Sequence, residues 1–183
     1  MEVDKYYQDM IDNILNGASD REQLEIILKL VEGLKGWNDK GDDYWTNLYY
    51  YNLEQIEQKI KVVLEKEDYY NSLCKAIRDY NELDKLLFHF ILVHNIQENK
   101  YGALSNFIRE DNRFSITNDL VEENMIDFWF KDILLTIKKD NDEYKLFGIE
   151  VYDKNGGLID TFDNIEDLNK KVEVLDNERE TNY

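Results

Sequence analysis

Apolar positions follow a helical period over roughly the first half of this chain. Over residues 3–15 and again over residues 24–34, apolar side chains recur at spacings of three, four and seven. This spacing predicts two amphipathic helices, each with one buried face. A third helix is expected from about residue 44 to residue 65, and a fourth over residues 69–80, with a turn at residues 66–68 between them.

The most apolar stretch of the chain is residues 83–96, with the sequence LDKLLFHFILVHNI. From Leu86 to Ile96, only His89, His94 and Asn95 are not plainly apolar. A helix that is apolar nearly all round is buried on most of its sides. We therefore expect this segment to be the central helix of an N-terminal bundle. The helix before it either continues into this stretch or breaks near Asn81.

Beyond residue 96 the helical pattern becomes weaker. A short helix is predicted through Leu104, Phe107 and Ile108. The segment SITND, residues 115–119, is interpreted as the cap of a further helix that reaches Met125.

Alternating apolar and polar residues then predict the strands of a small antiparallel sheet. The alternation begins at Ile133, Leu135 and Ile137, and it returns over residues 147–151 after a turn at residues 140–143. A third strand is expected over residues 158–162. The three strands follow one another closely enough to form a β-meander.

The hairpin around Asn155-Gly156-Gly157 allows two registers. With a two-residue loop, Val151 faces Asp160, and this acid then lies on the apolar face of the sheet. With a three-residue loop, Val151 faces Thr161, and Asp160 lies on the opposite face. We favour the three-residue loop, because burying an unpaired carboxylate costs several kcal/mol.

A last helix is predicted to begin after Asn164, which can cap it together with Asp167 three residues later. Residues 176–183 are expected to form a frayed tail. The fold class is therefore α+β. We expect residues 1–118 to form a helical bundle around a buried central helix. Residues 119–175 would form the β-meander and the C-terminal helix, packed on the bundle so that the two parts make one compact unit.

The amino-acid composition limits the kinds of partner that the protein can bind. Of its 183 residues, 40 are acidic and 22 are basic, which gives a formal net charge of −18. The 43% hydrophobic content and the 13 tyrosines exclude an acidic disordered chain. Direct binding to nucleic acid or to an anionic membrane is not expected, because phosphate groups require Lys and Arg to neutralise them. A basic protein surface is the natural counterpart.

The compartment is expected to be the cytoplasm. Cys74 is the only cysteine, which excludes an intramolecular disulfide and a cysteine-rich zinc site. The first ten residues, MEVDKYYQDM, have neither the basic nor the apolar region of a secretory signal. The apolar part of residues 83–96 is too short to span a membrane.

Candidates for catalysis are few. His89 and His94 are five residues apart, so on one helix they point about 140° away from each other and cannot share a metal ion. We interpret His89 as a hydrogen-bonded core residue, and we place His94 at the C-terminal end of the same helix. His94 and Glu98 have the spacing of a general acid–base pair, for example in RNA cleavage. No phosphate-binding or nucleotide-binding motif is present, and no cofactor or metal is expected.

Acidic residues are denser in the C-terminal third. Residues 1–118 carry 22 acidic and 14 basic side chains, whereas residues 119–183 carry 18 and 8. Carboxylates on one strand face are about 6.5–7 Å apart, close to the phosphate spacing of a nucleic-acid strand. The candidate partner-binding acids are Asp140, Asp142, Glu143, Glu150, Asp153, Asp160, Asp163, Glu166 and Asp167. The alternative is a solvated acidic face that only keeps the protein soluble. Tyr50 and Tyr51 are candidate aromatic anchors, since Tyr is common at interfaces.

In its small size, its strong acidity and its lack of catalytic motifs, the chain resembles the anti-defence proteins of phages and mobile elements, of the anti-CRISPR or antirestriction type. The resemblance implies an inhibitor that binds a basic nucleic-acid-handling protein, such as a Cas9-type effector or a restriction enzyme, and blocks its use of DNA or RNA. Two alternatives remain open. One is an immunity protein that neutralises a nuclease toxin, and the other is a small enzyme that acts on guide RNA or nucleotides through His94.

Overall fold

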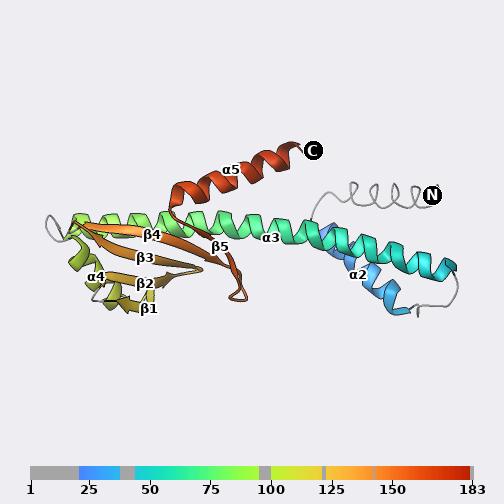
Figure 1. Ribbon diagram of the computed structural model, residues 1–183, viewed down its shortest axis with the longest axis horizontal. Coiled ribbons are helices and arrows are strands. Elements are labelled where there is room, and N and C mark those ends of the chain that lie inside the picture. Colours follow the sequence, from blue (N-terminus) through green and yellow to red (C-terminus); the bar gives the residue numbers. More distant parts are fainter. Residues whose placement is uncertain (1–20, 38–43, 95–99, 121–122, 142, 182–183) are drawn as a thin grey trace. The chain divides into compact units, whose positions relative to one another are not determined.

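The computed structural model describes residues 21–37, 44–94, 100–120, 123–141 and 143–181. Helices come first, followed by a five-stranded antiparallel sheet and a C-terminal helix, so the predicted α+β class is confirmed (Figure 1). The described elements are α2 (Arg21–Trp37), α3 (Tyr44–Val93), α4 (Lys100–Glu110), β1 (Phe114–Leu120), β2 (Met125–Phe130), β3 (Ile133–Asp140), β4 (Glu143–Tyr152), β5 (Leu158–Phe162) and α5 (Ile165–Thr181).

The chain divides into two compact units, Met1–Asp68 and Tyr69–Tyr183, and the division lies within α3. The boundary that the sequence suggested, residue 118, falls inside β1. The first unit contains α2 and the beginning of α3. The second contains the rest of α3, α4, the whole sheet and α5.

Helix α3 is one continuous helix of 50 residues. The predicted turn at residues 66–68 is therefore wrong. Of the two alternatives left open near Asn81, the structure shows the continuous helix. The reason is local, because α3 contains neither glycine nor proline. Lys and Glu are good helix formers, so a charged segment on the exposed side continues a helix rather than ending it.

In the first unit, α2 and α3 share a small apolar core formed by Leu24, Val31, Leu53, Ile56 and Ile60. Ion pairs border this core: Lys35 Nζ lies 2.6 Å from Glu57, and Arg21 Nη1 lies 2.6 Å from Asp68. The helix expected over residues 3–15 lies outside the described residues.

In the second unit, the sheet has the order β1-β2-β3-β4-β5, and every neighbouring pair is antiparallel. One face of the sheet packs against helices α3, α4 and α5 in a single core. The fully buried side chains of this core include Leu73, Leu83 and Leu87 of α3, Leu104 and Ile108 of α4, and Ile126, Phe128, Ile133, Leu135 and Ile137 of the sheet.

Strands β1 and β2 correct the interpretation of residues 115–125. SITND lies in β1 instead of capping a helix, and MIDFWF forms β2. An irregularity between Ile116 and Asn118 interrupts the pairing with β2. This shift breaks the period-two alternation within β1, which explains why its pattern did not predict a strand.

The strands predicted around residues 133–138 and 147–151 are confirmed as β3 and β4, but a bulge changes the faces of β4. Leu135 pairs with Ile149 and Ile137 pairs with Leu146, so β4 holds one more residue than β3 between these pairs. Gly148, with φ of 116°, lies in the bulge. Phe147 consequently does not share the buried face of Ile149, and its side chain is 56% exposed.

The register of the last hairpin differs from the one that we favoured. Val151 pairs with Asp160, not with Thr161. Asp160 therefore lies on the face of the sheet that is turned towards α3, where Tyr69 Oη donates a hydrogen bond to it over 2.5 Å. Because this carboxylate is paired, the cost that argued against the register does not arise.

The expectation that residues 83–96 form a helix buried on most sides is wrong. Residues 83–93 are the end of α3, and only one face of this part meets the core: Leu83 and Leu87 are fully buried there, and Leu86, Phe90 and Ile91 pack beside them. On its other face, Phe88, Leu92 and Val93 are 61–62% exposed. His89 is exposed as well, which corrects its interpretation as a core residue.

The predicted start of the last helix is confirmed. Asn164 Oδ1 accepts a hydrogen bond from the backbone N–H of Asp167 at 2.9 Å, and Asn164 Nδ2 donates to the Asp167 carboxylate at 2.8 Å. The helix does not fray at residue 176 but continues to Thr181. Contacts with Tyr70 support this extension, since Tyr70 Oη donates to Asp176 at 2.6 Å and the Arg179 guanidinium lies 4.3 Å from the ring centre.

Candidate functional site

Three of the acids proposed for partner binding have structural roles. Asp153 Oδ1 accepts hydrogen bonds from the backbone N–H groups of Asn155 and Gly157, both at 2.8 Å, and so shapes the β4–β5 loop. Asp160 is bonded to Tyr69, and Asp167 belongs to the cap of α5. Their carboxylates are oriented by these bonds and stabilise the fold around them.

Four other acids of the same set are exposed. Asp140 and Glu143 flank the β3–β4 turn, while Asp163 and Glu166 lie where β5 leads into α5. Asp142 lies outside the described residues. The exposed acids are thus displayed at turns and at a helix start, and they do not form one continuous strand face.

The two tyrosines proposed as anchors differ in their surroundings. Tyr51 is 57% exposed, as an anchor requires. Tyr50 is half-buried, and its hydroxyl donates a hydrogen bond to the backbone carbonyl of Lys35. Tyr49, their neighbour on α3, is exposed as well.

His94 lies just beyond the end of α3 and is exposed. Its ring packs against Phe90, with 4.6 Å between the ring centres. Glu98 lies outside the described residues, so the structure does not test the proposed acid–base pair. Among the residues that the structure describes, no group of three or more His, Cys, Asp or Glu side chains could hold a metal ion.

The sheet face opposite the core carries a row of side chains across all five strands. The pairing aligns Ser115, Trp129, Leu134, Glu150 and Thr161 on this face, which we call the open face. Trp129 and Leu134 lie outside the core cluster of the described residues, although the neighbouring Phe128, Phe130, Ile133 and Leu135 belong to it. The alternation of the strands thus places apolar and acidic groups together on a face that the core does not use.

Trp129, Tyr152 and Glu150 form a compact group on the open face. The rings of Trp129 and Tyr152 meet edge to face, with 4.6 Å between their centres and 60° between their planes. Tyr152 Oη donates a hydrogen bond to Glu150 Oε2 at 2.6 Å. This bond raises the pKa of Tyr152 above its ordinary value. The phenol therefore stays neutral and keeps the carboxylate beside the aromatic rings.

A second carboxylate of the open face, Asp127, is held by neighbouring strands. Thr136 Oγ1 donates to Asp127 Oδ1 at 2.7 Å, and Asn118 Nδ2 donates to Oδ2 at 3.3 Å. Neither donor carries a charge. These bonds hold the Asp127 carboxylate in place without pairing it with a cation.

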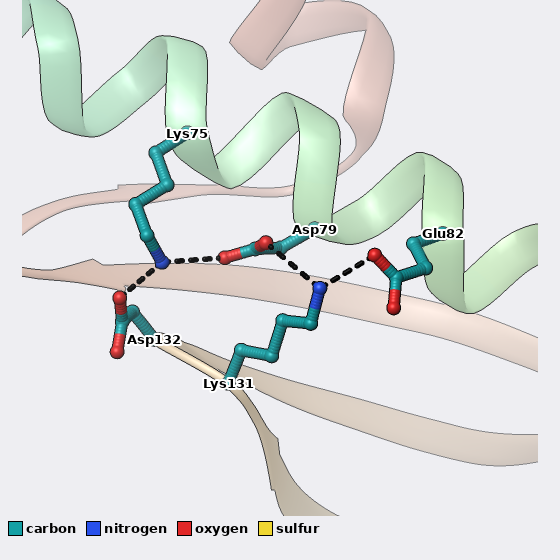
Figure 2. A network of polar contacts seen from close by, with 5 residues as sticks. All are labelled: Lys75, Asp79, Glu82, Lys131 and Asp132. Carbon is teal, nitrogen blue, oxygen red and sulfur yellow. Dashed lines mark hydrogen bonds and ion pairs between the residues drawn. The ribbon is translucent and has the colours of Figure 1, made fainter.

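At one end of the sheet, an ion network links α3 to the β2–β3 turn (Figure 2). Asp79 of α3 lies between two lysines: Lys75 Nζ is 2.9 Å from Oδ2, and Lys131 Nζ is 3.5 Å from Oδ1. Lys131 also contacts Glu82 at 2.5 Å, and Lys75 contacts Asp132.

Lys131 occupies a backbone position that glycine usually takes. It is the first residue of a two-residue turn and has φ of 54°. For a residue with a side chain, this conformation costs about 1–2 kcal/mol. The ion pairs of Lys131 with α3 hold the turn against the helix, so we assign the network to the stability of the sheet–helix packing.

Neither Trp129 nor Asp127 was predicted as a site residue, because β2 was not predicted as a strand. The signal is present in MIDFWF, where Ile126, Phe128 and Phe130 alternate with Asp127 and Trp129. Had the strand been recognised, its period of two would have placed the last two residues on the face opposite the core.

No protein-family model matches the chain, and neither a curated protein nor a solved structure matches it significantly. Among the described helices, none is both long and apolar enough to span a bilayer.

Proposed function

We propose that this protein is an acidic inhibitor that binds a basic nucleic-acid-handling protein, such as a Cas9-type effector or a restriction enzyme, and blocks its use of DNA or RNA. The observation that carries the proposal is a net charge of −18 on a chain that folds into a sheet–helix scaffold. Exposed carboxylates of this scaffold include Asp140, Asp163 and Glu166.

The scaffold restricts where these charges can move. Asp140 ends β3, one residue before Asn141, whose φ of 50° belongs to a tight turn. Asp163 and Glu166 flank the Asn164 cap of α5. Charges held on turns and caps lose less conformational freedom on binding than charges on a disordered tail, so more of their interaction energy remains as affinity.

The sign of the charge selects the class of partner. A nucleic-acid-binding groove is lined with Lys and Arg, which neutralise phosphates and release counterions. Fixed carboxylates interact with the same side chains. An acidic inhibitor would therefore compete with DNA or RNA for the groove, and long-range attraction would make its association fast and dependent on salt.

The test is an inhibition assay with the full-length chain. A Cas9-type effector is incubated with the protein before or after guide RNA is added, and cleavage of target DNA is followed at low and at high salt. We expect inhibition that weakens with salt and that depends on the order of addition. Cleavage that is unchanged at a large excess of the protein under every condition would contradict the proposal for this class of effector.

A restriction enzyme and a basic nuclease toxin serve as parallel targets in the same assay. Inhibition of the toxin alone would indicate an immunity protein. Cleavage of guide RNA by the protein, abolished by His94→Ala while binding is retained, would indicate the enzymatic alternative.

A further inference from the structure

The open face of the sheet combines aromatic rings with carboxylates, and the core of the described residues does not use it. We propose that this face binds an arginine side chain of the basic partner, with the guanidinium against Trp129 and Tyr152 and its N–H groups donating to Glu150. This inference rests on the proposed function for the class of partner. It adds the surface and the side chain that the surface recognises.

The three groups are already arranged for this role. Trp129 and Tyr152 fix each other through an edge-to-face contact with 4.6 Å between the ring centres. The hydrogen bond from Tyr152 to Glu150 keeps the carboxylate next to the rings. A carboxylate has about four lone-pair positions, so after accepting this bond it can still accept N–H groups from a guanidinium.

The chemistry of the site favours arginine over lysine. A guanidinium is planar, stacks on aromatic rings and donates in a fixed fork that matches a carboxylate. A cation over a tryptophan ring gains electrostatic energy as well, and this gain grows when water is excluded. An ammonium group would gain the charge interaction but not the stacking. The surface therefore discriminates between two side chains of equal charge.

Other occupants fit the surface less well. Nucleic-acid bases could stack on the rings, but this unit would repel their phosphates. Its residues 69–183 carry 24 acidic and 14 basic side chains. A second copy of the chain would bring the same negative charge. An apolar peptide would leave the charges of Asp127 and Glu150 without a counterpart. A basic protein surface satisfies both the rings and the carboxylates.

The test uses two short peptides, hexa-arginine and hexa-lysine, at equal ionic strength with the full-length protein. Binding is followed by NMR, because the indole N–H of Trp129 gives a separate signal that Trp129→Phe identifies. We expect hexa-arginine to bind at least about fivefold more tightly than hexa-lysine, and to shift the indole signal of Trp129 and the amide signals of Leu134, Glu150 and Tyr152.

Matched variants separate the proposed contact from general electrostatics. Glu150→Gln and Glu173→Gln remove the same charge, but only Glu150 lies on the open face; Glu173 is an exposed residue of α5. Likewise, Trp129→Ala is compared with Phe88→Ala, which removes an exposed aromatic ring elsewhere. We expect the open-face variants to weaken hexa-arginine binding about fivefold or more, and the controls to weaken it less than about twofold.

Equal affinity for the two peptides, or shifts confined to other parts of the unit, would overturn the inference. So would unchanged binding by Glu150→Gln. If Trp129→Ala fails to fold, the NMR signals that the peptides shift in the unmodified protein still show whether they bind at the open face. The proposed function can fail separately from this inference. If the protein binds hexa-arginine on the open face but inhibits no nuclease, the arginine site is supported and the inhibitor function is contradicted.

Discussion

Tyr69 of α3 donates a hydrogen bond to Asp160 of β5, with 2.5 Å between the two oxygen atoms. The bond joins the helix to an edge strand of the sheet. It also accounts for the register of the last hairpin, in which Asp160 pairs with Val151 and faces the helix. A residue that looked like a surface acid in the sequence is thus part of the internal packing.

Removing this hydroxyl should destabilise the protein. In Tyr69→Phe, a half-buried carboxylate loses its side-chain donor and keeps only the backbone N–H of Thr161, so we expect the free energy of unfolding to fall by about 1–3 kcal/mol. The measurement is urea unfolding of Tyr69→Phe, Asp160→Asn and the double variant. A coupling energy near zero in this cycle would show that the two side chains do not stabilise each other in solution. Tyr70→Phe, which loses a more exposed bond to Asp176, is the control and should cost less.

The tyrosines of α3 also predict a loss of stability at alkaline pH. Burial and the hydrogen bond to Asp160 raise the pKa of Tyr69, the hydrogen bond to Asp176 raises that of Tyr70, and burial raises the pKa of Tyr80 to about 12. The folded state therefore favours the neutral phenols. Their contribution to stability is complete below the unfolded pKa, about 10, and is lost as the pH rises through the folded values.

The measurement for this prediction is the urea midpoint between pH 9 and pH 11. It should fall over this range, and it should fall less steeply in the variant Tyr80→Phe. The same slope in the variant and in the unmodified protein would contradict the assignment of the effect to Tyr80.

Asp79 should be the most sensitive residue of the ion network in Figure 2, because its side chain is only 8% exposed and two lysines contact it. We expect Asp79→Asn to lower the free energy of unfolding by about 1–3 kcal/mol. Glu82→Gln, which removes an exposed member of the network, should cost less than about 1 kcal/mol. Equal losses in the two variants would contradict the importance of burial at Asp79.

The contribution of the α5 cap to stability can be tested by replacing asparagine with alanine at two positions. Asn164→Ala removes the acceptor of the Asp167 N–H, and we expect a loss of about 1 kcal/mol in the free energy of unfolding. Asn169→Ala, within the same helix and exposed, should leave the stability unchanged or raise it slightly, since alanine is the better helix former. Thermal or urea unfolding of both variants gives the comparison.

The position of the exposed acids should matter more than their number. The triple variant Asp140→Asn, Asp163→Asn, Glu166→Gln and the control Glu32→Gln, Glu65→Gln, Glu110→Gln change the net charge equally. At low salt, we expect the first to reduce the association rate with a Cas9-type effector about tenfold, and the control to reduce it far less. Stopped-flow or surface-based kinetics measure this rate. Equal reductions in the association rate would show that the rate depends on the total charge of the protein and not on the positions of the acids.

The sequence by itself determined the fold class, the last three strands and the α5 cap. These features depend on local periodicity and on short-range hydrogen bonds, such as that between Asn164 and Asp167. The continuity of α3 was also determined locally, by the absence of glycine and proline, although the charged residues 66–68 suggested a turn.

Only the tertiary structure decided which side chains face inwards. The bulges near Thr117 and Gly148 shift the alternation of β1 and β4, and no local pattern reveals a one-residue shift. The register of the last hairpin was decided in the same way. It places Asp160 opposite Val151, where the half-buried carboxylate accepts a hydrogen bond from a hydroxyl 91 positions earlier in the chain.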